Sequence, residues 1–346
     1  MAEMPVPTWF VPTLEALLDR RDLAPAEVEA LMEGLLAGAC GQVETAALLV
    51  ALRFKGETAA ELAAAAAVMR RHCQPLVTDT PGLLDTCGTG GDGSGTFNIS
   101  TATALVVAGA GVKVVKHGNR AISSASGSAD VLTELGAHIT ADPAVARRCL
   151  AEAGLAFLMA PLYHPALRHV GEVRRRLGVR TMFNCLGPLA NPAAARRQLL
   201  GVGRAEWLDR MAGALAILGT DDALLVHSRD GLDEVSLSAP TMARRVRGGE
   251  VTEAEWTPED FGLPRSPLES LRAAGAKASA ATIRAVLAGE RGPPRDVVLA
   301  NSAAALLVAG AAPDLRGGVE RAAAAIDAGR ATAALETLIA LTRSTC

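Results

Sequence analysis

The sequence predicts a small helical N-terminal domain followed by a larger α/β domain, whose mostly parallel central sheet is flanked by helices. Two observations predict this fold class. From Thr13 to about Arg71, apolar residues recur at helical spacing with few strand formers between them. After a break at Pro75 to Pro81, short β-like runs alternate with Ala-rich helical stretches, a pattern typical of a parallel sheet covered by helices.

These patterns also set the expected domain boundaries. The helical domain is expected over residues 1–74 and the α/β domain over residues 75–346. A basic stretch near residues 164–182 again has a helical pattern, and we expect it to pack against the N-terminal helices. Strands of the sheet are predicted at residues 83–85, 112–116 and 223–227.

The composition excludes several classes of function. Among 346 residues, 34 Lys and Arg against 37 Asp and Glu leave a net charge of -3, so no nucleic-acid partner is expected. With 3 Trp, 1 Tyr and 6 Phe, the apolar half of the chain consists mainly of small aliphatic side chains. The basic residues are nearly all Arg, because Lys occurs only at positions 55, 113, 116 and 277. The position of each lysine therefore needs an explanation.

No signal for a metal cluster of cysteines, for secretion or for a membrane is found. The 6 cysteines form no C-x-x-C pair, which argues against a zinc site and a disulfide framework. The first residues, MAEMPVPTWF, lack a basic region followed by an apolar one. The longest apolar stretches, near 59–69 and 102–115, are too short or too interrupted to span a bilayer. We therefore expect a cytoplasmic protein without a membrane partner.

The most informative segment runs from Leu83 to Val112. A predicted strand leads into 5 glycines within 8 residues, and Asn98 then opens an Ala/Val-rich helix. Glycines let backbone N–H groups crowd around an anion, and a helix N-terminus adds unpaired donors and the positive end of its dipole. A phosphate is therefore the predicted ligand of this first loop.

The sequence of the first loop also matches the glycine motif of a dinucleotide-binding site. Gly88 to Gly93 satisfies G-x-G-x-x-G, but that motif needs an acidic residue about 20 positions later to bind the ribose hydroxyls. Lys113 and Lys116 stand there instead. The sequence therefore disfavours a dinucleotide.

A second polar loop follows the next predicted strand, between Lys116 and Gly136. The carboxyl ends of neighbouring parallel strands meet at one edge of a sheet, so the two loops are expected side by side. They could bind two phosphates or share a diphosphate. The candidate ligands of the second loop are Lys116, Asn119, Arg120, Ser123, Ser124 and Ser128.

A third candidate is the carboxylate pair Asp233 and Glu234, after the strand predicted at 223–227. Mg²⁺ is usually held by one or two carboxylates together with substrate phosphate oxygens. An adjacent Asp and Glu alone are most often an exposed surface pair. Only the combination with two phosphate loops favours a magnesium site.

Four motifs resemble those of the anthranilate phosphoribosyltransferase family, in order and in spacing. They are GTGGDGSGTFNIST (88–101), KHGNRAISSASGSAD (116–130), RTMFNCLGPLANP (180–192) and DGLDE (230–234). The segments LRFKGET (52–58) and DVVLANSAAALLVAG (296–310) are similar to the family as well. The resemblance covers nearly the whole chain.

The resemblance implies an activity, a cofactor and an assembly. The family transfers the phosphoribosyl group of phosphoribosyl diphosphate to the amine of anthranilate, a step of tryptophan biosynthesis that releases diphosphate. The implied cofactor is Mg²⁺, and the implied partners are these two small substrates. The family fold is a helical domain hinged to an α/β domain of the nucleoside phosphorylase type, usually as a homodimer paired through the helical parts.

The resemblance also assigns roles to residues of this chain. Magnesium would be bound by Ser100, Asp233 and Glu234, anthranilate by Gly88, His117, Asn119 and Arg174, and the catalytic candidates are Lys116, Asn119 and Arg174. The sugar diphosphate would be surrounded by Gly88, Gly91, Asp92, Thr96, Asn98, Ile99, Ser100, Thr101, Lys116, His117, Gly118, Asn119, Arg120, Ala121, Ile122, Ser123, Ser124 and Ser128.

Two alternatives stay open at this point. A pyrimidine nucleoside phosphorylase-like enzyme would share the architecture but use inorganic phosphate on a nucleoside. A non-catalytic paralogue would bind a sugar phosphate without turning it over. The intact loop motifs and DGLDE speak against both.

Overall fold

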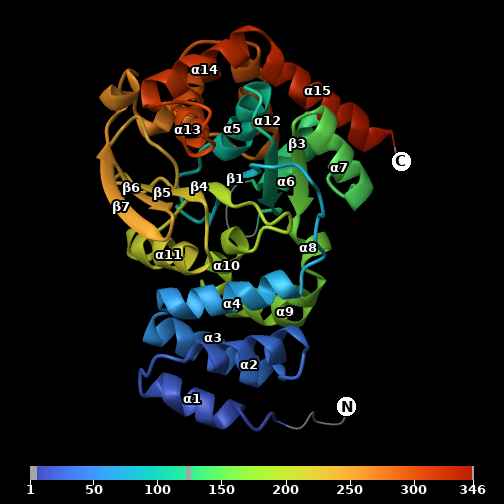
Figure 1. Cartoon of the computed structure of the whole chain (residues 1–346), viewed down its shortest axis with the longest axis vertical. Coiled ribbons are helices and arrows are strands. Elements are labelled where there is room, and N and C mark those ends of the chain that lie inside the picture. The colour runs from blue at the N-terminus through green and yellow to red at the C-terminus, as the bar shows by residue number, and fades with distance from the viewer. Residues whose placement is uncertain (1–5, 122–125, 345–346) are drawn as a thin grey trace.

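The computed structural model describes residues 6–121 and 126–344. Most of the chain lies in helices around one sheet (Figure 1). The helices are α1 (Phe10–Leu18), α2 (Pro25–Leu36), α3 (Gln42–Lys55), α4 (Ala59–Arg71), α5 (Ile99–Gly109), α6 (Ser128–Leu135), α7 (Pro143–Glu152), α8 (Ala160–Tyr163), α9 (Arg168–Leu177), α10 (Phe183–Leu189), α11 (Ala205–Ile217), α12 (Ala276–Leu287), α13 (Pro293–Val308), α14 (Leu315–Asp327) and α15 (Arg330–Arg343), with short 3₁₀ turns η1 (Pro165–Leu167), η2 (Pro258–Phe261) and η3 (Leu268–Leu271).

The central sheet has 7 strands in the order β3-β2-β1-β4-β5-β6-β7. The first five strands of the chain pair in parallel, and the last two add to one edge in antiparallel fashion. The predicted α/β class with a mostly parallel sheet is thus confirmed. The strands are β1 (Leu84–Gly88), β2 (Val114–Gly118), β3 (Leu155–Met159), β4 (Arg197–Gly201), β5 (Asp222–Ser228), β6 (Thr241–Arg247) and β7 (Glu250–Trp256).

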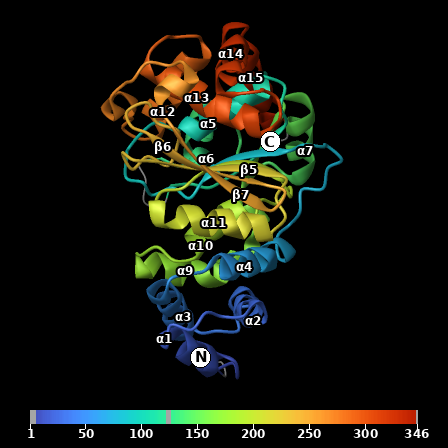
Figure 2. The same ribbon diagram turned by 60° about the vertical axis from the view of Figure 1, so that its left-hand side comes forward.

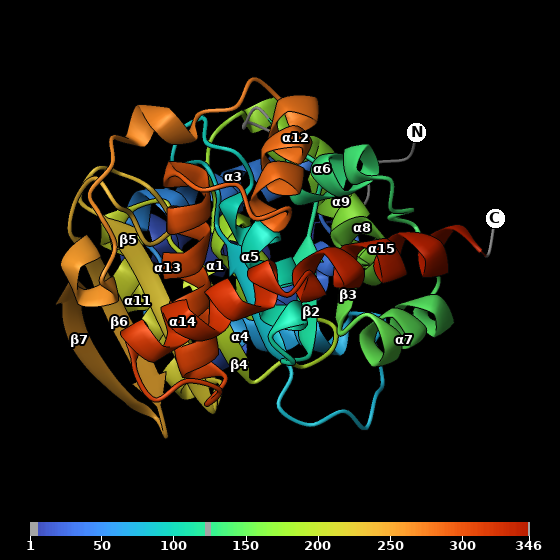
Figure 3. The ribbon, with the colours of Figure 1, turned by 90° about the horizontal axis from the view of Figure 1, so that it is seen from above.

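Helices cover both faces of the sheet. On one face lie α5, α13, α14 and α15, and on the other lie α10 and α11, followed by α4 and then the remaining N-terminal helices (Figures 1 and 2). Seen from above, α14 and α15 cross over α5, and β7 forms the outer edge of the sheet (Figure 3). One apolar core continues from this second face into the N-terminal helices, and α9 packs against α2 and α3. None of the helices in the described part of the chain is long and apolar enough to cross a bilayer.

Two predicted strands are displaced along the chain. β1 extends to Gly88, and β2 runs from Val114 to Gly118, so both end later than the apolar pattern indicates. The reason is pairing, because Gly88 aligns with Gly201 of β4 and Gly118 with Met159 of β3. Backbone pairing across the sheet therefore carries the first glycine of each motif into its strand.

A buried charge network explains Lys55, one of the few lysines. Its Nζ is 2.8 Å from Glu61 Oε2 and 2.7 Å from Asp22 Oδ1, and its side chain is 2% exposed. The Glu61 carboxylate also accepts from the N–H of Thr58 and of Leu23, both at 2.8 Å. Thr58 and Glu61 thus form a capping box at the start of α4. Lys55 therefore neutralises a fully buried carboxylate that ties three segments of the helical part together.

We expect Lys55→Met to lower the free energy of unfolding by about 3 to 5 kcal/mol, because removing one partner leaves the Glu61 carboxylate buried without its counter-charge. Denaturant unfolding followed by circular dichroism measures the loss. The exposed Lys277 provides the control, since Lys277→Met removes a lysine from the surface. A loss below about 1 kcal/mol in Lys55→Met would mean that the network contributes little.

Candidate active site at the carboxyl edge of the sheet

The predicted site residues gather where parallel strands end. Gly88 ends β1, Gly118 ends β2, Gly201 ends β4, and the segment with Asp233 and Glu234 follows β5. The carboxyl edge of a parallel sheet is where ligands of open α/β folds bind. The two loops and the carboxylate pair therefore share one edge, as the sequence predicts.

The first loop is fixed from the neighbouring strand and from Asp233. The Thr89 N–H donates to the Gly201 carbonyl at 2.9 Å, and the Gly90 N–H donates to Asp233 Oδ2 at 3.1 Å. A Cβ at Gly88 would lie 3.1 Å from the same Asp233 oxygen. Gly91 has a φ of +73°, which only glycine adopts without strain. The loop thus passes directly over one carboxylate of the predicted metal pair.

The predicted ligand-binding residues at the start of α5 fall into two groups that differ in exposure. Asn98 and Ser100 are partly accessible, and Asn98 Oδ1 is buried without a partner in the described structure. Ile99 and Thr101 are each 1% exposed and face the core. Asn98 and Ser100 therefore offer side chains to a ligand. Ile99 has no polar side-chain group, and its N–H already donates to the Phe97 carbonyl at 2.8 Å.

The other residues of the first loop are held within it. Asp92 Oδ1 accepts from the Ser94 N–H at 3.3 Å, and the Ser94 and Thr96 hydroxyls are 3.3 Å apart. Thr96 also forms a β-bridge with Arg272. The loop is therefore anchored at its far end as well as at Gly90.

Lys116 places a buried cation below the first loop. Its Nζ donates to the Thr86 carbonyl and to Ser100 Oγ, the latter at 3.1 Å, and the residue is 3% exposed. Burial lowers the pKa of Lys116, while the nearby carboxylates of Asp85 and Glu234 oppose that shift. The ammonium thus acts through its field and through Ser100.

The carboxylate pair suits a divalent cation. Burial and the neighbouring Asp92 raise the pKa of Asp233 to about 7, and burial together with Asp233 raises the pKa of Glu234 well above its usual value. The Glu234 carboxylate also interacts with the backbone of Ser100. The local excess of negative charge is one that Mg²⁺ would neutralise. Among the described residues, no three His, Cys, Asp or Glu side chains form a preassembled metal cluster, so the ion would share its coordination with substrate oxygens.

The second loop is organised by Asp130, which the sequence reasoning did not select. Its carboxylate accepts from Arg120 Nη1 at 2.9 Å, from the Ala121 N–H at 2.9 Å and from the Gly127 N–H at 3.0 Å. Asn119 Oδ1 accepts from the Arg120 N–H at 2.8 Å, and Asn119 and Arg120 are exposed. The signal was present, because an acidic residue at the third position of a helix is typical of a cap.

Contacts also join the second loop to its strand and to the first loop. The Ser128 hydroxyl lies directly against Gly118, where no Cβ would fit. The Asn98 side-chain amide donates to the Ser126 carbonyl at 3.3 Å. The predicted ligands Ile122, Ser123 and Ser124 lie outside the described residues.

We expect Asp130→Ala to weaken the binding of a phosphate-bearing ligand at the second loop several-fold and to lower the free energy of unfolding by about 1 kcal/mol, since three donors lose their acceptor. Burial raises the pKa of Asp130, but hydrogen bonds from Ala121, Gly127 and Arg120 outweigh it and lower the pKa. The contribution of the Asp130 carboxylate to the free energy of unfolding is therefore present above about pH 4, and it is lost as this carboxylate protonates below that pH. The difference in unfolding energy between wild type and variant should narrow below about pH 4. Asp130→Asn, which keeps one acceptor, should be intermediate, and equal values for all three proteins would contradict the role.

His117 and Arg174 each contact α10, His117 at Gly187 and Arg174 at Phe183. The His117 Nδ1 is 3.1 Å from the Gly187 carbonyl, its ring centre is 5.1 Å from that of His164, and its Nε2 is buried without a partner in the described structure. Burial and His164 lower the pKa of His117 to about 3, so the ring is neutral at physiological pH. The Arg174 guanidinium lies 5.2 Å from the centre of the Phe183 ring. Within the described ranges, no hydrogen bond or ion pair joins Arg174 to the other candidates.

Two further buried polar residues, Asp85 and Asn191, link β1, β2 and the segment after α10. Asp85 is 0% exposed and accepts from the Asn191 side-chain amide at 2.8 Å and from the His117 N–H at 3.3 Å. The same amide nitrogen of Asn191 donates to the Val115 carbonyl at 2.8 Å. These contacts hold β1, β2 and the segment after α10 in register. Sequence alone did not indicate them, because the partners are separated by 106 and 76 residues.

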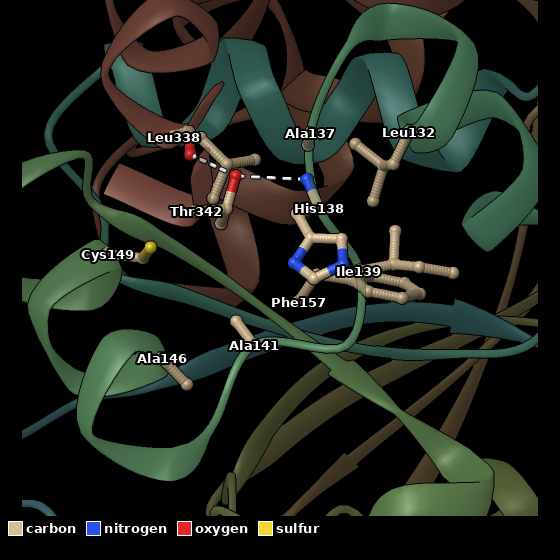
Figure 4. Close-up of a pocket in the computed structure, with 10 residues that line it drawn as sticks. All are labelled: Leu132, Ala137, His138, Ile139, Ala141, Ala146, Cys149, Phe157, Leu338 and Thr342. Carbon is tan, nitrogen blue, oxygen red and sulfur yellow. Dashed lines mark hydrogen bonds between the residues drawn. The ribbon is translucent and has the colours of Figure 1, made fainter. Parts of the chain in front are cut away.

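A cavity of about 10 Å³ lies between α6, α7, β3 and α15 (Figure 4). Apolar side chains such as Leu132, Ile139 and Phe157 line most of it, with Cys149 and Thr342 at its wall. It has room for about one water molecule, so it is a packing defect and no ligand site.

Both parts of the chain match models of one class of protein. Residues 80–332 match the glycosyl transferase family a/b domain, and residues 11–73 match the glycosyl transferase family helical bundle domain. The fold and the loops at the carboxyl edge of the sheet thus define a glycosyl transferase with a helical bundle and an a/b domain.

Relatives narrow the class. The anthranilate phosphoribosyltransferase of Chloroflexus aggregans is 51% identical over 332 residues, 95% of this chain and 97% of the relative. The solved enzyme of that name from Thermus thermophilus is 44% identical with a TM-score of 0.89, covering 96% of this chain and 99% of the other. The one from Saccharomyces cerevisiae in complex with PRPP and Mg is 28% identical with a TM-score of 0.89, covering 97% and 98%. This chain belongs to the anthranilate phosphoribosyltransferase family.

Proposed function

We propose that this chain transfers the 5-phosphoribosyl group of phosphoribosyl diphosphate to the amine of anthranilate, in tryptophan biosynthesis in the cytoplasm, with Mg²⁺ as cofactor. One observation carries the proposal. Two loops that are predicted to bind phosphate and the carboxylates of Asp233 and Glu234 lie at one edge of the sheet, in a chain of this family. PRPP and Mg are bound by the Saccharomyces cerevisiae relative, and another complex of that relative contains 4-fluoroanthranilate.

The chemistry needs charge stabilisation more than a strong base. The bond from ribose C1 to the diphosphate oxygen breaks as the amine nitrogen bonds to C1, so positive charge develops on the sugar and negative charge on the leaving group. The neutral aryl amine attacks, and its proton is then released to solvent. Mg²⁺, bound by Asp233, Glu234 and the Ser100 hydroxyl, would supply a counter-charge for the diphosphate. N–H donors of the first loop and the field of Lys116 add to it.

The second substrate is assigned to the wall formed by α9 and α10. Arg174 is half-buried, burial lowers its pKa, and no carboxylate of the described residues pairs with it. A guanidinium held on an aromatic ring and without a protein counter-ion suits a bound carboxylate, which it can grip through two parallel hydrogen bonds. Gly88, His117 and Asn119 would face the anthranilate ring and amine from the loops.

We expect Arg174→Ala to raise the apparent KM for anthranilate by about 10-fold or more, because a charge-assisted hydrogen bond is lost. The KM for phosphoribosyl diphosphate should change little. Steady-state kinetics with each substrate varied in turn measure both constants. Arg175 is the matched control, since it is exposed and pairs with Glu172 on the same helix. A rise confined to the sugar diphosphate would place anthranilate elsewhere.

The test of the whole proposal is turnover of anthranilate with phosphoribosyl diphosphate, followed by the loss of anthranilate fluorescence with and without Mg²⁺. Activity that depends on Mg²⁺ supports it, and no product at saturating substrates refutes it. The phosphorylase and paralogue alternatives are not favoured, because relatives at 51% identity bear the name anthranilate phosphoribosyltransferase.

We also propose a homodimer formed through the helical part, residues 1–74 with 164–182, with residues 75–346 as the α/β part. Supporting this, α1 and α3 pack together and leave large apolar side chains exposed, among them Leu18 at 59%, Val43 at 78% and Phe54 at 61%. An apolar surface of this kind is typical of a protein interface. Light scattering after size-exclusion chromatography should give twice the 35.5 kDa chain mass.

A further inference from the structure

The guanidinium of Arg180 lies against the first loop where the loop turns. Arg180 Nη2 donates to the Gly90 carbonyl. A Cβ at Gly91 would collide with Nη2 and lie 2.5 Å from Cζ, so the flat group packs directly on the Gly91 backbone. The Gly90 N–H, on its other side, donates to Asp233 Oδ2 at 3.1 Å. Gly90 is therefore held at both ends, by Arg180 and by a proposed magnesium ligand.

The segment after β4 also contacts the first loop, at Thr89 and Gly90. Gly203 follows β4, and its N–H donates to Thr89 Oγ1 at 2.8 Å. A Cβ at Gly203 would lie 2.5 Å from the Gly90 carbonyl oxygen and 3.4 Å from Arg180 Nη1. Arg180 thus fills a space that the missing side chains of Gly91 and Gly203 leave open.

Arg180 also contacts Trp207 of α11, and α11 packs against the N-terminal helices. Arg180 Cζ lies 5.2 Å from the centre of the Trp207 ring, and Arg53 Cζ of α3 lies 5.7 Å from it. Trp207 is 2% exposed, and α11, which carries it, packs against α4. A guanidinium on an indole is held by cation–π attraction in addition to packing. The orientation of Arg180 is thus set from outside the loop.

One unfavourable feature of Arg180, an unpaired buried donor, indicates that its other contacts serve the function. Arg180 Nη1 is buried without a hydrogen-bond partner in the described structure, which is unfavourable for such a donor. A native structure retains such a group where its other contacts are needed. The needed contact here is the one to Gly90, because this hydrogen bond joins Arg180 to the proposed diphosphate site.

We propose that Arg180 is a positioning residue for phosphoribosyl diphosphate, which acts through Gly90 to hold the first loop and Asp233 in the geometry that binds the diphosphate and its metal ion. Arg180 does not itself contact the reacting atoms. It transmits the placement of Trp207 and the helical part to the loop. This inference rests on the proposed function of the site.

The test compares Arg180→Ala and Arg180→Lys with wild type. Isothermal titration calorimetry measures the Kd for phosphoribosyl diphosphate with Mg²⁺ in the absence of anthranilate, and steady-state kinetics measure both KM values. We expect the Kd and the KM for phosphoribosyl diphosphate to rise about 10-fold or more in both variants, as is usual when a group that orients a metal ligand is removed. The KM for anthranilate should change less than about twofold. Arg176→Ala, which removes an exposed arginine of the same segment, is the control and should behave as wild type.

The Arg180→Lys variant distinguishes an effect of the planar shape of the guanidinium from an effect of its positive charge. Lysine keeps the positive charge but has no planar group to lie between Gly91 and Trp207. Wild-type affinity in Arg180→Lys would overturn positioning in favour of charge alone. Unchanged diphosphate affinity in Arg180→Ala, or a loss that only matches a lower folded fraction in thermal unfolding, would overturn it as well. Binding is measured without turnover, so a wild-type chain that binds the diphosphate but makes no product would refute the proposed function and still decide the role of Arg180.

Discussion

Asp233→Asn combined with Glu234→Gln is expected to lower kcat/KM by about 100-fold or more, since a metal ion at a charged leaving group contributes several kcal/mol to transition-state stabilisation. Both substitutions preserve size and remove the negative charge that would bind Mg²⁺. They also remove a buried charge, since burial and the neighbouring Asp92 raise the pKa of Asp233 to about 7, so folding should be retained or improved. The expected signature is lost activity in a stable protein.

Two measurements check this expectation. Activity titrated with Mg²⁺ should need a much higher concentration in the double variant, and thermal unfolding should show no loss of stability. Glu250→Gln is the control, because Glu250 is an exposed carboxylate on the outer strand β7. Activity within about threefold of wild type in the double variant would remove the metal from this pair, given the several kcal/mol that a catalytic metal supplies.

Lys116→Met is expected to lower kcat/KM by about 100- to 1,000-fold, the range found when a preorganised electrostatic contact to a developing charge is removed. Burial lowers the pKa of Lys116, and nearby carboxylates, among them Asp85 and Glu234, oppose that shift. Its ammonium also donates to the Ser100 hydroxyl at 3.1 Å. Its loss leaves the carboxylate pair without that counter-charge and frees Ser100. Lys116→Arg should restore little, because a planar guanidinium does not reproduce the compact point charge that contacts the Thr86 carbonyl and Ser100.

Lys113 offers a matched control on the same segment. Its Nζ donates to the Leu150 and Ala151 carbonyls at 3.0 and 2.7 Å, at the opposite end of β2 from the site. Lys113→Met should retain nearly full activity. Near-wild-type rates in Lys116→Met, with the folded state verified by circular dichroism, would show that the buried ammonium serves structure alone.

Local features of the site could be predicted from the sequence. The glycines at and after the end of β1, the helix that follows Asn98 and the cation at Lys116 could all be predicted from short stretches of chain with a known preference. The same reasoning selected Asp233 and Glu234 only through their combination with the two phosphate loops, because an adjacent Asp and Glu have no local signature. It assigned Lys116 to the substrate, which stays a prediction, and the structure adds two protein partners of its ammonium, the Thr86 carbonyl and the Ser100 hydroxyl.

Long-range contacts could not be predicted in this way. Arg180 begins a motif of the family, yet its partner Gly90 is 90 residues away. Lys55 had no explanation until Glu61 and Asp22 were seen to surround its ammonium. Neither contact follows from spacing or propensity, because each forms only when separate helices and strands pack.

By itself the sequence determined the class of fold, the order of its parts and the chemistry of the loops. Each of these depends on residues close together along the chain, where periodicity and backbone preference act. Only the tertiary structure decided which groups meet. It put Gly90 between Arg180 and Asp233 and left Arg174 without a counter-ion among the described residues. The physical reason is that hydrogen bonds and ion pairs act over a few ångströms in space, and packing alone sets that distance for residues far apart in sequence.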